Sequence, residues 1–135
     1  MKLGLDFHGV IDAEPKLFSV MTQKLMKMGH EVHIITGMEL TDRFYAKLKA
    51  FHISYTTVFS ISSYHKGIGT KVWYDEKDTP WLDQETWVVS KAWYCKKNKI
   101  DLHLDDSEAY LQHFLTPSLL VTPEVLSFLK LIVEV

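Results

Sequence analysis

The chain has a single cysteine, Cys95, among its 135 residues, so no disulfide can form within it. It also lacks a strong charge of either sign, because 15 lysines and arginines nearly balance 17 acidic residues and give a formal net charge of −2. This balance argues against a protein that holds nucleic acid by broad electrostatic attraction, although a local basic patch is compatible with it. No hydrophobic run is long enough to cross a bilayer and no signal peptide is recognisable, so we expect a cytoplasmic protein without a membrane partner.

The pattern of apolar residues alternates between strand and helix, which predicts an α/β fold. Strands are expected over residues 2–6, 31–35, 55–61, 101–105 and 118–121, and helices over 15–28, 42–51, 85–98, 107–114 and 123–133. Hydrophobic residues make up 47% of the chain, which is enough to form a core at this length. We therefore predict a single domain over residues 1–135, built as a Rossmann-like three-layer sandwich around a mainly parallel five-stranded sheet.

Three of the predicted strands end in residues that can carry chemistry. The first ends in Asp6, the second is followed directly by Thr36, and the fourth ends in Asp105, the first residue of an acidic pair. Parallel strands have their carboxyl ends at one edge of a sheet, so these residues are expected to converge although they are far apart in sequence. The sequence thus predicts a crevice that holds carboxylates and a hydroxyl group.

Four segments, in the right order, resemble the motifs of the haloacid dehalogenase (HAD) superfamily. They are Asp6 with Gly9–Asp12, then Thr36–Gly37, Lys91 and Asp105–Asp106. The resemblance covers the chain from its start to about Ser107, and it implies a HAD-like fold and an Mg²⁺-dependent phosphatase. In that superfamily the first aspartate, here Asp6, attacks a phosphate ester and forms an aspartyl phosphate. The chain departs from the pattern at His8, where the phosphatases carry a second aspartate.

The resemblance also implies a metal site. Oxygen ligands from the Asp6 carboxylate, the main-chain carbonyl of His8 and the Asp105 carboxylate would suit Mg²⁺. Asp106 is expected to support Asp105 or to hold Lys91, and the alternative role for it is to cap the following helix.

Two further matching segments are implied to bind the transferred group. Thr36 and Gly37 would contact the phosphoryl oxygens, and Lys91 would supply positive charge to the nucleophile and the phosphoryl group. Lys91 is preferred because the other lysines nearby lie at the end of the helix, where the helix dipole or solvent accounts for them. Those other lysines are Lys96, Lys97 and Lys99.

The departure at His8 leaves two interpretations open. An imidazole exchanges protons near neutral pH, so His8 could donate a proton to the leaving group and later activate water. Members of the superfamily without the second acid often do other chemistry or none, so a binding or regulatory protein is the alternative. Asp12 fits either the rim of the crevice or a role in the turn.

Residues 62–84 interrupt the alternation and are expected to form a short insert or flap after the third strand. The segment is too short for a full cap domain, so the resemblance implies a nearly capless member. It contains Trp73 and Trp81, which would either pack the insert against the body or stack on a nucleobase or sugar. The expected substrate is a small phosphomonoester, with a nucleotide favoured and a polynucleotide end as the further alternative.

Seven histidines make zinc worth considering, and His33 and His103 both lie on predicted strands. No cysteine pair and no helical His-x-x-x-His spacing supports a zinc site. Buried, hydrogen-bonded histidines are therefore the expected outcome for this pair.

Overall fold

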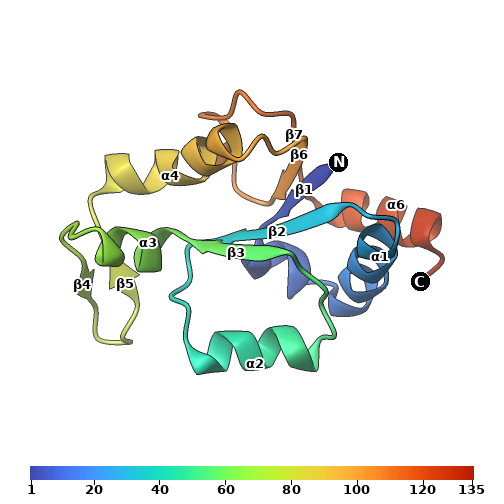
Figure 1. Cartoon of the computed structure of the whole chain (residues 1–135), viewed down its shortest axis with the longest axis horizontal. Coiled ribbons are helices and arrows are strands. Elements are labelled where there is room, and N and C mark those ends of the chain that lie inside the picture. Colours follow the sequence, from blue (N-terminus) through green and yellow to red (C-terminus); the bar gives the residue numbers. More distant parts are fainter.

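A five-stranded parallel sheet forms the centre of the molecule in the computed structural model, which describes residues 1–135 (Figure 1). The strand order is β3-β2-β1-β6-β7, and every neighbouring pair is parallel. The strands are β1 (Lys2–Leu5), β2 (Glu31–Thr36), β3 (Thr57–Ser60), β6 (Leu102–Asp105) and β7 (Ser118–Leu120). The predicted α/β architecture with a five-stranded sheet is confirmed, and the sheet is entirely parallel.

Helices cover both faces of this sheet, so the fold has three layers (Figure 1). One layer contains α1 (Pro15–Lys27), α2 (Asp42–Ala50) and α6 (Pro123–Val133). The other contains α3 (Ile61–Gly67), α4 (Gln84–Lys97) and α5 (Glu108–Leu111). None of these helices is both long and apolar enough to span a membrane.

Alternation along the central strand β2 separates the core into two parts. Ile34 belongs to the larger part, where it packs with Phe18 of α1 and Phe44 of α2. The next residue, Ile35, points to the opposite face and joins Tyr94 of α4. Successive strand residues face opposite sides of a sheet, so a sheet that is buried on both faces needs apolar side chains at consecutive positions.

The predicted insert after the third strand contains a helix that the sequence pattern did not indicate. The strand expected over 55–61 covers only Thr57–Ser60, because the Ser60 side chain accepts a hydrogen bond from Ser63 N and caps α3. A two-stranded antiparallel hairpin follows, made of β4 (Trp73–Tyr74) and β5 (Pro80–Trp81). We call residues 73–81 the hairpin; it projects from the body beside α3 (Figure 1).

Candidate functional site

The carboxyl ends of the strands line one pocket of about 760 Å³, which is within the usual range for small-molecule sites. Asp6 follows β1 directly, Thr36 ends β2, and Asp106 follows β6. The pocket wall also includes Lys91 from α4, part of α2 and the tip of the hairpin. The convergence expected from the parallel topology is therefore present.

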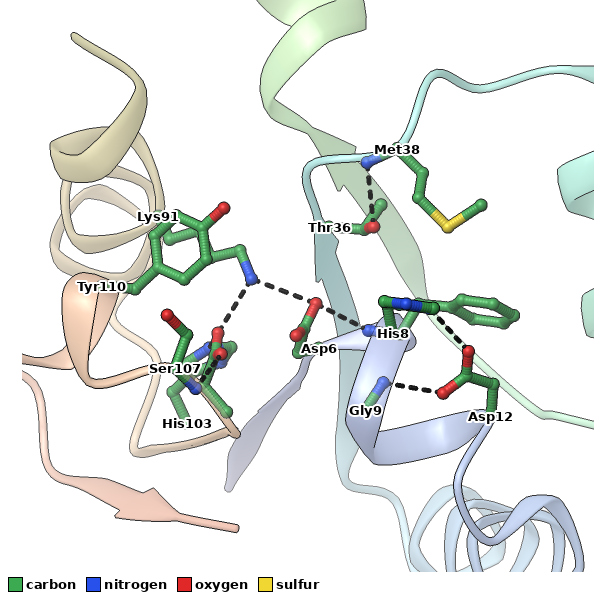
Figure 2. Close-up of polar contacts among 12 residues, drawn as sticks. Asp6, His8, Gly9, Asp12, Thr36, Met38, Lys91, His103, Ser107 and Tyr110 are labelled. Carbon is green, nitrogen blue, oxygen red and sulfur yellow. Dashed lines mark hydrogen bonds and ion pairs between the residues drawn. The ribbon is translucent and has the colours of Figure 1, made fainter. Parts of the chain in front are cut away.

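Lys91 lies at the centre of the site and is almost completely buried, with 1% of its surface exposed. Its Nζ is 3.0 Å from Asp6 Oδ1 and donates a hydrogen bond to Asp105 Oδ2 at 2.8 Å (Figure 2). The ring of Tyr110 covers the ammonium group, with 4.1 Å between Nζ and the ring centroid. Burial alone would lower the pKa of Lys91, but the charges of Asp6 and Asp105 hold it above its usual range.

The two carboxylate oxygens of Asp6 have different environments. Oδ1 accepts a hydrogen bond from Phe7 N at 2.8 Å and faces Lys91, whereas Oδ2 makes no hydrogen bond within the chain. Burial raises the pKa of Asp6 to about 8; Lys91 opposes this rise and the neighbouring Asp105 and Asp106 add to it. A second positive charge at this position would stabilise the ionised form of Asp6.

The carboxylate of Asp105 is fully buried and its oxygens are already engaged. Oδ2 accepts from Lys91 and lies 2.9 Å from His103 Nε2, and Oδ1 accepts from Ser107 N at 3.1 Å. Burial would raise the pKa of Asp105, but the hydrogen bond from His103 and the charge of Lys91 hold it below its usual range. His103 is a buried histidine of the expected kind, and burial lowers its pKa.

Asp106 has the opposite character, because it is exposed, lines the pocket and does not bond to Lys91. The expectation that Asp106 would hold Lys91 is wrong, since Asp105 does so. Asp6, Asp105 and Asp106 each offer a carboxylate oxygen, and these oxygens lie within 4.8 Å of one another. Such a set of hard oxygen donors could hold a metal ion.

Gly9 allows Asp106 to reach this position. A Cβ atom on Gly9 would overlap the Asp106 carboxylate, and the φ angle of Gly9 is +81°, a conformation that residues with side chains rarely adopt. The glycine of the first motif is therefore required both by the turn and by the close approach of the acid from β6.

The irregular helical turn after β1, η1 (Phe7–Ile11), carries His8 at the pocket, and Asp12 caps the end of this turn. His8 Nδ1 is 2.7 Å from Asp12 Oδ2, and Gly9 N donates to Asp12 Oδ1 at 2.7 Å (Figure 2). The His8 side chain is 84% exposed and lines the pocket. Asp12 thus orders the turn and fixes one ring nitrogen of His8.

The loop after β2 is held in place by neighbouring hydroxyl groups. Thr36 Oγ1 accepts from Met38 N at 3.1 Å, which leaves its own proton free to donate (Figure 2). Ser60 and Ser62 donate to the carbonyls of Met38 and Gly37 at 2.6 and 2.9 Å, so α3 and the strand before it brace this loop.

The structure does not bring Trp73 and Trp81 into the pocket. Both are exposed on the hairpin, where Trp81 Nε1 donates to Asp75 Oδ2 at 2.9 Å. The pocket is instead lined by Trp87 of α4, whose ring lies over Gly37; a Cβ atom there would be 2.7 Å from the indole. The spacing of the tryptophans in the sequence does not reveal that Trp87 lines the pocket while Trp73 and Trp81 do not. The position of Trp87 depends on how α4 crosses the sheet.

Comparison with known proteins adds no family assignment: no protein-family model matches the chain, and no curated protein was found to match it. The geometry of the site and the sequence motifs that occupy it are therefore the guides to its function.

The raised pKa of Asp6 makes a prediction about stability in the absence of metal. Between about pH 4 and pH 8 the folded state binds more protons at Asp6 than the unfolded state, so this residue lowers stability as the pH rises. Asp6→Asn removes the titration. In the presence of a chelator, Asp6→Asn should melt higher than wild type at pH 8, by on the order of 5 °C, and close to wild type at pH 4. Thermal melts at a series of pH values test this, and a difference that does not change with pH would contradict it.

Proposed function

We propose that this protein is an Mg²⁺-dependent phosphatase of the HAD type that hydrolyses a small phosphomonoester through an aspartyl phosphate on Asp6. The proposal rests on the different contacts of the two carboxylate oxygens of Asp6. One carboxylate oxygen is fixed by Phe7 N and Lys91, while the other is unpartnered on a pocket wall next to further acids. This arrangement suits a carboxylate nucleophile.

The residues present fit a magnesium ion. Asp6, Asp106 and the main-chain carbonyl of His8 would hold it, and Asp105 adds negative charge from its buried position beside Lys91. Bound Mg²⁺ supplies the positive charge that reduces repulsion between a carboxylate and a phosphate ester. The high pKa of Asp6 without metal is consistent with this need, because three carboxylates here face one ammonium group.

The chain's own residues supply the other parts of the reaction. Asp6 Oδ2 would attack phosphorus, and the bond from phosphorus to the ester oxygen would break. Thr36 would donate its free hydroxyl proton to a phosphoryl oxygen, and Lys91 would orient Asp6 and favour its ionised form. Water would then attack the phosphorus of the aspartyl phosphate and release inorganic phosphate.

His8 would carry the proton in both steps. With the Asp12 carboxylate accepting from Nδ1–H, the Nε2 atom is the one left to exchange a proton with the leaving oxygen and with water. Asp12 would therefore be a positioning residue that acts through His8. This pair takes the place of the second aspartate that the HAD phosphatases carry.

The pocket also offers a place for the organic part of the ester. Trp87 and Tyr110 give it an aromatic wall on one side, and Met38 and Phe44 line the other. Aromatic surfaces stack well on planar rings, so a nucleotide remains the favoured substrate.

Release of inorganic phosphate from a panel of phosphomonoesters, with Mg²⁺ and with a chelator, tests the proposed activity. We expect release that requires Mg²⁺ and falls more than about 10³-fold in Asp6→Asn, since the nucleophile is lost. Full activity in Asp6→Asn would exclude the mechanism. A wild type that binds Mg²⁺ but hydrolyses no ester would favour a binding or regulatory protein instead.

The metal ligands are tested by a matched pair of charge changes in one pocket. Asp106→Asn should weaken Mg²⁺ binding about tenfold or more, because it removes a charged oxygen ligand. Asp78→Asn removes the same charge from the hairpin wall of the pocket, outside the acid cluster, and should bind Mg²⁺ nearly as wild type does. Titration calorimetry measures both, and equal losses would mean that only the overall charge matters.

The role of the His8–Asp12 pair is tested by its dependence on the leaving group. His8→Ala should reduce hydrolysis of alkyl phosphates about 10²-fold but reduce hydrolysis of p-nitrophenyl phosphate much less, because a good leaving group needs little protonation. Asp12→Asn should show the same selectivity to a smaller degree. In the His8→Ala background, Asp12→Asn should have no further effect on turnover. Additive losses would show that Asp12 acts through the turn and not through His8.

A further inference from the structure

The wall of the pocket formed by α2 carries positive charge that the proposed reaction does not use. Arg43 and Lys47 are one helical turn apart on α2, and both line the pocket. Neither makes a hydrogen bond or an ion pair with another side chain in the structure. Arg43 lies in the first turn of α2, whose capping residue Thr41 lines the same pocket, and Lys47 lies in the last turn.

Two other charged side chains of the pocket, Lys91 and Glu39, have partners of opposite charge or hydrogen-bond donors. Lys91 is paired with Asp6 and Asp105, and Glu39 accepts from Tyr74 at 2.7 Å and from Lys66 at 3.4 Å. On the hairpin tip, Lys77 and Asp78 also line the pocket, and neither side chain makes an ion pair in the structure. Arg43 and Lys47 on α2, with Lys77 on the hairpin, are thus the positive groups in the pocket with no acidic partner.

The size of the pocket leaves room for a ligand that reaches these groups. At about 760 Å³ it is far larger than a single phosphoryl group next to Asp6, and it extends between α2 and the tip of the hairpin. In the view of Figure 1, both elements lie below the central sheet. The amino-terminal end of α2 also carries the partial positive charge of the helix dipole, which favours an anion there.

We infer that the natural substrate carries a second phosphate group, and that Arg43 and Lys47 bind it while Asp6 attacks the first. This inference rests on the proposed phosphatase activity and names the class of substrate: an organic bisphosphate. Arg43 can bind two oxygens of a phosphate with its planar guanidinium, and Lys47 adds a point charge from the next turn. The hydrolysed and the bound phosphate would occupy opposite ends of one pocket.

Two matched sets of substrates test the inference. One compares adenosine 3′,5′-bisphosphate with the two adenosine monophosphates, and the other compares fructose 1,6-bisphosphate with its two monophosphates. We expect a kcat/KM at least about tenfold higher for one of the bisphosphates than for its monophosphates. The first set tests a nucleoside as the organic part and the second tests a sugar.

Variants on α2 identify the binding group. Arg43→Met and Lys47→Met should each reduce kcat/KM for the preferred bisphosphate about five- to tenfold and leave the monophosphates nearly unchanged. Lys49→Met is the control, because Lys49 is exposed on the same helix, does not line the pocket and loses the same charge. Binding of the bisphosphate to Asp6→Asn, measured by calorimetry, should weaken when Lys47→Met is added and should weaken with salt.

The outcomes separate this inference from the proposed activity. Hydrolysis of monophosphates and bisphosphates at equal rates would overturn the inference and leave the phosphatase intact. A preference for a bisphosphate that Arg43→Met and Lys47→Met do not reduce would also overturn it. If no ester is hydrolysed while the bisphosphate still binds through Lys47, the anion site is supported and the phosphatase proposal fails.

Discussion

The contact on which the site depends is the burial of Lys91 between Asp6 and Asp105. It joins α4 to the two neighbouring strands β1 and β6 at the point where these strands end. Loss of the Lys91 ammonium would leave buried carboxylates without their cation, a change that typically costs about 3–5 kcal/mol. The same contact leaves an excess of negative charge, because Asp106 adds a third carboxylate to one ammonium group. A site with this excess of negative charge could hold a cation.

The surrounding structure can be understood as support for this arrangement. Gly9 has no side chain, so Asp106 can approach the turn that follows Asp6. Asp12 fixes both that turn and the ring of His8, and Ser60 and Ser62 hold the loop that follows Thr36. Each support comes from an element adjacent to a strand end, which is where open parallel sheets place their ligands.

The sequence predicts the strands and the parallel sheet well, because both depend on local patterns of apolar residues. Apolar alternation located all five strands, and the order of strands and helices implied their parallel arrangement, which brings Asp6, Thr36 and Asp105 to one edge.

The helix α3 was missed because it is short and has little apolar periodicity. The different burial of the two residues of the acidic pair, Asp105 and Asp106, was also not predicted. Both residues are aspartates, and only the packing around Lys91 decides that Asp105 is buried and Asp106 exposed. Trp87 and the cations of α2 could not be assigned for the same reason, since helix placement across the sheet decides what lines a pocket.

We propose that Asp6 is a nucleophile toward phosphorus in a site completed by Mg²⁺. Beryllofluoride mimics a phosphoryl group bound to a carboxylate, so it tests this claim without knowledge of the substrate. In ¹⁹F NMR spectra, wild type should show bound beryllofluoride only when Mg²⁺ is present, and Asp6→Asn should show none under any condition. Bound signals that persist in Asp6→Asn, or their absence in a wild type that binds Mg²⁺, would contradict the account.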